Sequence, residues 1–162
     1  MSPNPAAAFY VGDAGLNDIE IYGRIVDSVD NFLFAFSTST EFVVEFIFGG
    51  YTLDGGGFIS DSGFVSEGNA EKTATFSLLD ADNMFAVVDT EDYTTDVTSG
   101  DATIFSGAAG NWVLQIDGSG AHAPGAGVGL YDIRISEVPV PASALLLMAG
   151  LGGLGAMRRR KG

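Results

Sequence analysis

A regular alternation of apolar and polar residues recurs along most of the chain, between residues 9 and 136. This period of two favours β-strands, in which successive side chains point to opposite faces. The clearest case is the stretch 42–48, whose apolar face carries Phe42, Val44, Phe46 and Phe48. Seven similar stretches, each closed by Gly, Asp, Asn or Ser clusters, are Ile19–Tyr22, Phe32–Phe36, Thr73–Leu79, Met84–Val88, Thr103–Phe105, Trp112–Ile116 and Leu130–Ile135. The pattern therefore predicts eight short strands.

No helical pattern separates these strands, so the crossover helices that parallel sheets require are not expected. The predicted fold class is all-β, an antiparallel β-sandwich or jelly roll in which two sheets bury their inward faces on each other. The two largest loops are expected at the Gly-rich segments 49–63 and 118–129. We assign residues 9–137 to this single domain.

The two ends of the chain differ from the body in composition. Residues 1–8 contain neither a positive segment nor an apolar one, so they do not read as a complete signal peptide. We interpret them as a disordered N-terminus and, because they end in alanines, as the remnant of a signal peptide. Residues 138–162 follow a Pro-containing junction and form a separate C-terminal segment.

Composition and charge exclude several classes of function. Among 162 residues there is no Cys and a single His, which excludes disulfides, thiolate metal sites and histidine clusters. The formal net charge of -14 repels phosphate backbones, so nucleic acid is not expected as a partner. All 21 acidic residues lie between Asp13 and Glu137, together with only three basic ones. Such an acidic body suits an extracellular setting, where salt screens its self-repulsion.

The C-terminal segment has the composition of a short membrane span. Residues 142–157 carry no charge, and adding residues 138–141 gives the length of about 20 residues that a bilayer core requires. Four cations follow, and the positive-inside rule places them in the cytoplasm and the body outside: Arg158, Arg159, Arg160 and Lys161. A buried helix in a soluble domain is the alternative, but four glycines between residues 150 and 155 disfavour it. We therefore predict a short hydrophobic helix that enters the membrane.

The order of features in this segment resembles a known bacterial sorting signal. Val-Pro-Val-Pro-Ala, a Leu- and Gly-rich stretch and a terminal Arg-Arg-Arg-Lys are similar to the PEP-CTERM signal in its Val-Pro-x-Pro-Ala variant. The resemblance implies recognition in the inner membrane of a Gram-negative bacterium by exosortase, a membrane-embedded cysteine transpeptidase. It also implies transient anchoring through residues 142–157, with the four terminal cations as the cytoplasmic stop. The recognition segment would be Val138, Pro139, Val140, Pro141 and Ala142.

Parts of the body resemble the bacterial pre-peptidase C-terminal domain, a small jelly-roll module of secreted proteins. The similar stretches are Asp30–Phe36, Ser77–Asp82, Gly110–Ile116 and Gly129–Ile135. The resemblance implies the same fold and assigns no activity.

Candidate catalytic residues are few. His122 is the single base available to a serine triad, and no Gly-x-Ser-x-Gly elbow is present. Two acids that converge in a pocket would instead be required for glycoside hydrolysis, and sequence alone does not show convergence. Because most of the acids flank turns, where they satisfy backbone groups, we expect no catalytic residues and no enzyme activity.

Calcium is the cofactor that this composition allows. It binds six to eight oxygen ligands, which acid-rich turns supply without His or Cys. Two clusters qualify, although neither follows the EF-hand pattern; their candidate ligands are Asp80, Asp82, Asp89, Glu91, Asp92 and Asp96. The alternative is that these acids are solvated turn residues, which is the commoner situation.

Aromatic residues could form a sugar-stacking platform, the candidates being Trp112, Tyr51, Tyr93 and Tyr131. Alternation places Trp112 on the same face as Leu114 and Ile116, which favours a place in the core.

We therefore expect a secreted, non-enzymatic protein of the cell surface or exopolysaccharide matrix. The alternative is a calcium-assisted glycan-binding module at the cell surface.

Overall fold

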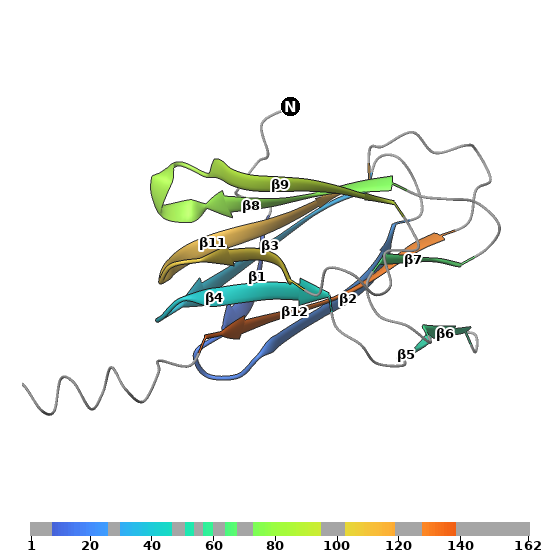
Figure 1. Cartoon of the computed structure of the whole chain (residues 1–162), viewed down its shortest axis with the longest axis horizontal. Coiled ribbons are helices and arrows are strands. Elements are labelled where there is room, and N and C mark those ends of the chain that lie inside the picture. Colours follow the sequence, from blue (N-terminus) through green and yellow to red (C-terminus); the bar gives the residue numbers. More distant parts are fainter. Residues whose placement is uncertain are drawn as a thin grey trace, which may run out of the picture.

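The computed structural model describes residues 8–25, 30–46, 51–53, 57–59, 64–67, 73–94, 103–118 and 128–138. Their dominant feature is a pair of five-stranded β-sheets that face each other in two layers (Figure 1). Sheet A has the order β1 (Phe9–Asp13), β3 (Asn31–Thr38), β11 (Gly110–Asp117), β8 (Thr73–Asp80) and β9 (Ala86–Thr94). Sheet B has the order β10 (Thr103–Gly107), β4 (Phe42–Phe46), β12 (Val128–Glu137) and β2 (Ile19–Ile25), and β7 (Phe64–Glu67) also pairs with β12.

The remaining elements are small. Strands β5 (Tyr51–Leu53) and β6 (Gly57–Ile59) form a two-stranded sheet, and a 3-10 helix, η2, spans Ala81–Asn83. The strand pairs are antiparallel, with the exception of the parallel pair β1–β3. The predicted all-β sandwich is confirmed.

The core lies between the two sheets and consists of the residues that the alternation placed inward. On β4, Phe42, Val44 and Phe46 are buried, while the intervening residues are not. Aromatic rings join the layers edge to face: Phe36 of sheet A meets Phe42 of sheet B at 5.2 Å between ring centroids. Phe46 and Phe76 do the same at 5.5 Å. Such pairs add to the free energy gained from apolar burial, because ring edges are positive and ring faces negative.

Several of the expected elements differ from the structure, and β7 corresponds to none of the predicted strands. Strand β9 begins at Ala86, not at Met84, because Met84 and Phe85 both adopt left-handed backbone angles, with φ of 52° and 57°. The segment predicted as one loop, 49–63, contains β5 and β6, whose three residues each are too short to show alternation. Strand β1, missing from the prediction, carries a register shift at Gly12 that interrupts its period of two.

No helix within the described residues has the length and apolar character needed to cross a membrane. The predicted span, residues 142–157, lies outside the described residues, as does Phe48.

Candidate functional site

The end of β12, where the body meets the C-terminal segment, is fastened to the turn between β3 and β4. Glu137 accepts hydrogen bonds from the backbone N–H and the Oγ of Ser39, the latter at 2.9 Å. It also accepts from the Thr40 backbone N–H at 3.2 Å and from Thr40 Oγ1 at 2.9 Å. We call Glu137, Ser39 and Thr40 the junction clamp.

Hydrogen bonding to the charged form keeps Glu137 ionised. The bond from the Ser39 backbone is the main cause that lowers the pKa of Glu137 below its ordinary value of 4.5, and the Ser39 and Thr40 hydroxyls add to it. A lowered pKa in the folded state means that the clamp contributes its stability above pH 4.5 and loses it as the pH falls further. The junction is therefore fastened at neutral pH.

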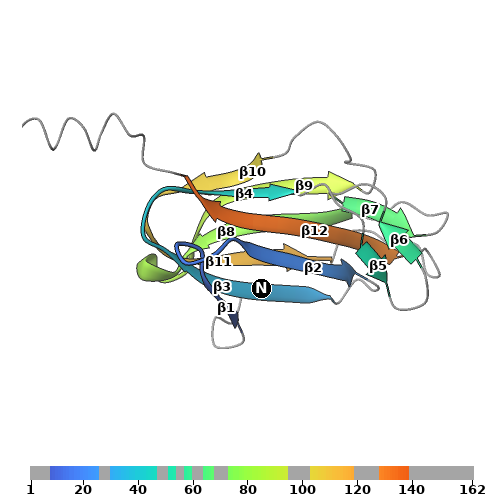
Figure 2. The same ribbon diagram turned by 90° about the horizontal axis from the view of Figure 1, so that it is seen from below.

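An aromatic groove lies between β2 of sheet B and β3 of sheet A. Figure 2 shows these two strands next to each other. The groove has a volume of about 540 Å³. Its aromatic lining consists of Phe9, Tyr22, Phe32, Phe34 and Tyr131. Arg24 and Asp30 form its charged lining, and Gly23 also lines it. Phe9 and Tyr22 are 76% and 60% exposed, so their rings are open to a ligand.

The floor of the aromatic groove is rigid. Phe32 and Phe34 stack with ring centroids 6.4 Å apart, and Phe32 also contacts the buried Tyr131 at 6.3 Å. Tyr131 lies across Gly23, where a Cβ atom would be 2.3 Å from the tyrosine hydroxyl oxygen. Burial, together with the charge of Asp30, raises the pKa of Tyr131, so its hydroxyl stays protonated at neutral pH. Alternation does not reveal this groove, because its residues come from four different strands.

The other predicted aromatic candidates lie elsewhere. Trp112 is buried in the core beside Phe42, as its alternation predicted, and its indole N–H donates to the Ala108 carbonyl at 3.1 Å. Tyr93 is partly buried against Phe46 and Phe76. The side chain of Tyr51 lies outside what the structure describes. Of the four candidates, Tyr131 is the one that lines the aromatic groove.

The first acidic cluster stabilises a turn. Asp80 caps η2 by accepting hydrogen bonds from the Asp82 and Asn83 backbone N–H groups at 2.9 and 3.2 Å. Asp82 lies in η2 and accepts from the Asn111 side chain and backbone, and these bonds lower its pKa. Asp80 and Asp82 do not share one face of an extended strand, because β8 ends at Asp80 and Asp82 lies in η2.

The second acidic cluster is divided between two faces of β9. Asp89 and Glu91 pair with the core residues Leu78 and Phe76, whereas Asp92 lies on the opposite face and accepts a hydrogen bond from Thr75. Asp96 lies outside the described residues, and so does His122. Among the acids that the structure places, no three gather closely enough to hold a metal ion. Calcium binding stays a prediction.

Asp132 is a buried acid that the alternation pattern did not single out. It lies in the middle of β12, opposite Tyr22, and is fully buried, and neither carboxylate oxygen has a hydrogen-bond partner among the residues that the structure describes. Burial, with a smaller effect of the Glu20 charge, raises its pKa to about 7. Asp132 alternates with the core residues Tyr131 and Ile133, and the structure shows that its side chain is covered as well.

Of the predicted sorting residues, Val138 is described and 37% exposed, whereas Pro139, Val140, Pro141 and Ala142 lie outside the described residues. The four terminal cations, residues 158–161, also lie outside.

Residues 137–161 match the PEP-CTERM protein-sorting motif. The match confirms the sorting signal predicted from the sequence, and this signal implies export, processing by exosortase and sorting to the cell surface.

The fold is similar to the pre-peptidase C-terminal domain of collagenase from Bacillus anthracis, at 11% sequence identity and a TM-score of 0.45. This similarity covers 83% of the present chain and 100% of the other. The neighbour is of the domain class that the body sequence resembles. No curated protein matches the chain.

Proposed function

We propose that this protein is a non-enzymatic component of the cell surface or exopolysaccharide matrix, delivered there through its C-terminal segment. The observation that carries the proposal is the sorting motif, which begins at the last residue of a folded β-sandwich. The acids at the η2 turn support a structural role, because they accept hydrogen bonds from neighbouring backbone and side-chain groups. In this proposal residues 142–157 enter the inner membrane transiently, with Arg158–Lys161 on the cytoplasmic side.

The proposal is tested by changing the two prolines of the recognition segment in a bacterium whose exosortase matures the wild-type chain. The double variant Pro139→Ala/Pro141→Ala should accumulate as the longer precursor, measured by the mass of the protein extracted from the envelope. Normal maturation of this variant would contradict processing at the motif. Deleting Arg158–Lys161 should misplace the segment, and protease accessibility of the body from outside measures this.

A second candidate function, glycan binding by the body, is favoured by the aromatic groove. Sugar rings stack on exposed aromatic faces, and Phe9 and Tyr22 present such faces above a rigid aromatic floor. Arg24 and Asp30 add charged groups at the same groove, to which sugar hydroxyls can hydrogen-bond. Since the body carries 21 acids and only three bases, we infer a neutral glycan rather than an anionic one.

This second candidate is tested by titrating the protein with the neutral hexasaccharide cellohexaose. Phe9→Ala and Tyr22→Ala should each weaken binding about tenfold, a loss of about 1.4 kcal/mol. Tyr10→Ala is the matched control, because Tyr10 is 65% exposed on β1, the strand of Phe9, but does not line the groove. Equal affinities in all three variants, or no binding by the wild type, would contradict a glycan site of this kind here.

A further inference from the structure

The sorting motif begins inside the folded body, not beyond it. The match starts at Glu137, the acidic member of the junction clamp. The next residue, Val138, donates its backbone N–H to the Glu41 carbonyl at 2.7 Å. Residue 139 is a proline, which has no N–H to donate. Val138, the first residue of the recognition segment, is therefore the last one before the prolines that a backbone hydrogen bond holds on the body.

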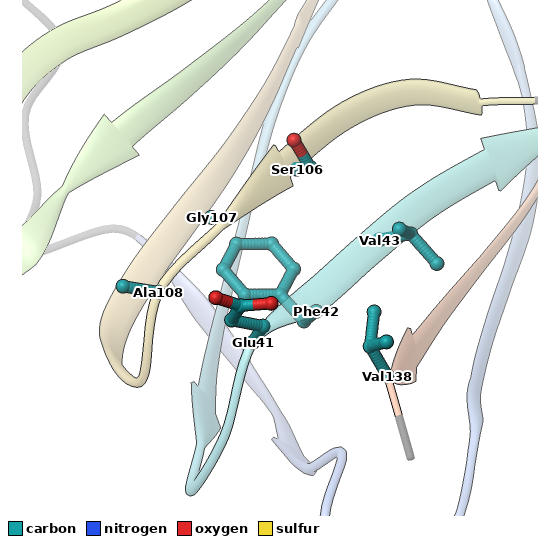
Figure 3. A pocket seen from close by; sticks show the side chains of 7 residues that line it. All are labelled: Glu41, Phe42, Val43, Ser106, Gly107, Ala108 and Val138. Carbon is teal, nitrogen blue, oxygen red and sulfur yellow. The ribbon is translucent and has the colours of Figure 1, made fainter. Parts of the chain in front are cut away.

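A second groove lies beside Val138, where the recognition segment begins (Figure 3). It has a volume of about 290 Å³, and we call it the junction groove; its lining residues are Glu41, Phe42, Val43, Ser106, Gly107, Ala108 and Val138. Val43 and Val138 lie on one side of the Phe42 ring and Ala108 on the other (Figure 3). The first residue of the recognition segment is thus a wall of a groove formed by the body.

The body holds the junction groove in shape. The Phe42 ring is fully buried and packs against Gly107, where a Cβ atom would lie 2.5 Å from the ring. The hydrogen bond from the Trp112 indole to the Ala108 carbonyl fixes the opposite wall. The junction clamp fixes Val138 through its neighbour Glu137. A surface ordered in advance loses little conformational entropy when a partner binds.

The length of the recognition segment keeps a processing enzyme close to this surface. The recognition segment continues for four residues beyond Val138, and an extended chain spans at most about 3.6 Å per residue. Any enzyme that cuts near the prolines therefore works within about 14 Å of the junction groove. That distance is smaller than the diameter of a small protein domain.

We propose that the junction groove is a docking surface for exosortase on the body of its own substrate. The inference rests on the proposed processing at the motif, and the groove is continuous with the motif through Val138. Its apolar walls and the exposed Glu41 carboxylate fit an apolar side chain of the enzyme that is flanked by a cation. Recognition then involves the folded body as well as the linear segment.

The experiment changes the groove and leaves every residue of the motif intact. Ser106→Trp fills the groove from an exposed position of β10, and Glu41→Lys reverses the charge at its rim. Thr40→Val removes one hydroxyl from the junction clamp and leaves the sequence of the motif, residues 137–161, unchanged. Each variant is expressed in the exosortase-containing bacterium, and the rate of conversion from precursor to mature protein is measured by pulse-chase.

Matched controls come from the exposed edge strand β9. Val88→Trp introduces the same bulk and Glu91→Lys the same charge change at exposed positions outside the junction groove. Thermal melts of each purified variant show whether the body has kept its fold. Glu41→Lys, at a surface position, keeps the test valid if the Ser106→Trp body does not fold.

The expected result is conversion about tenfold slower in Ser106→Trp and Glu41→Lys, a smaller slowing in Thr40→Val, and wild-type rates in the β9 controls. Wild-type rates in all folded groove variants, together with a block in Pro139→Ala/Pro141→Ala, would overturn the docking surface while leaving processing at the motif intact. Faster conversion in the filled groove would also overturn it, because it would mean that the groove had sheltered the chain's own segment.

Discussion

Asp132 is a buried acid whose carboxylate oxygens have no hydrogen-bond partner in the described part of the chain. Its side chain is fully buried on β12, and its pKa of about 7 lies well above the ordinary value of 3.8. A group with a raised pKa in the folded state favours folding below its unfolded pKa, and this contribution is lost as the pH rises toward the folded pKa. The folded protein therefore becomes less stable between about pH 4 and pH 7, through this residue alone.

Replacing Asp132 with Asn should remove that loss, because the amide does not ionise. Between pH 5 and pH 8 the wild type should lose up to about 3 kcal/mol of unfolding free energy more than Asp132→Asn does. Urea unfolding at both pH values measures the difference. Equal losses in the two proteins would show that Asp132 is not the titrating group.

Met84 occupies a backbone conformation that suits glycine. Its φ is 52° and its side chain is 90% exposed, so removing the side chain costs little burial. The left-handed conformation costs a residue with a Cβ atom about 1 to 2 kcal/mol, which a change to glycine would relieve. The greater flexibility of glycine in the unfolded chain offsets part of this gain in stability. Met84→Gly should raise the unfolding free energy by about 0.5 to 1 kcal/mol. Met84→Ala, which keeps the Cβ atom, should show no such gain in the same urea titration.

At the scale of the elements, the connection from β10 to β11 carries the chain from sheet B to sheet A. Gly107, at the end of β10, allows the Phe42 ring to approach, and Trp112, near the start of β11, is hydrogen-bonded to Ala108 between them. The short connection between the sheets thus depends on the absence of a side chain at Gly107 and on the indole of Trp112. It also forms a wall of the junction groove, so the packing of the core and the shape of that groove are coupled.

Adding a methyl group at Gly107 should disturb this crossing. Its Cβ would lie 2.5 Å from Phe42 and 3.1 Å from Trp112, and both rings are buried in the core. Gly107→Ala should lower the unfolding free energy by about 1 to 3 kcal/mol, the usual cost of overpacking. Ser106→Ala, at the exposed neighbouring position, should change it by less than about 0.5 kcal/mol. A Gly107→Ala protein as stable as the control would contradict the close packing.

Strand by strand, the sequence predicted the elements whose alternation is uninterrupted. The inward residues of β4 and β11 follow from the period of two, and Trp112 falls in the core for that reason. Strand β1 escaped prediction because its bulge at Gly12 shifts the period. The start of β9 was misplaced because backbone dihedrals at Met84 and Phe85 are not visible in an apolar pattern.

For the molecule as a whole, sites that form across several strands could not be read from the chain. The aromatic groove gathers Phe9, Tyr22 and Tyr131 from three strands, and the junction clamp joins Ser39 to Glu137 across 98 positions. The sorting signal is linear, so its residues could be named in advance. The two acidic clusters were adjacent in sequence, yet the turn at η2 and the two faces of β9 separate their carboxylates.

The excess of negative charge on the body should make its stability depend on salt. Raising sodium chloride from about 0.01 M to 0.5 M shortens the screening length several-fold, so the melting temperature should rise. Calcium chloride at matched ionic strength should raise it by no more than sodium does, because the described acids of the two clusters point in different directions. A further rise of about 5 to 10 °C that a chelator reverses would contradict this expectation and indicate a bound ion.

The position of β12 has a mechanical consequence. This strand is bordered by β2 on one side and by β4 and β7 on the other, and its last residue leads directly into the C-terminal segment. Any pull on that segment acts along the strand axis, perpendicular to the antiparallel hydrogen bonds of the ladder. The load is then shared by many bonds in shear instead of opening them one after another. The body is thus joined to its C-terminal segment through the strand with the most neighbours in sheet B, an arrangement suited to resisting a pull on that segment.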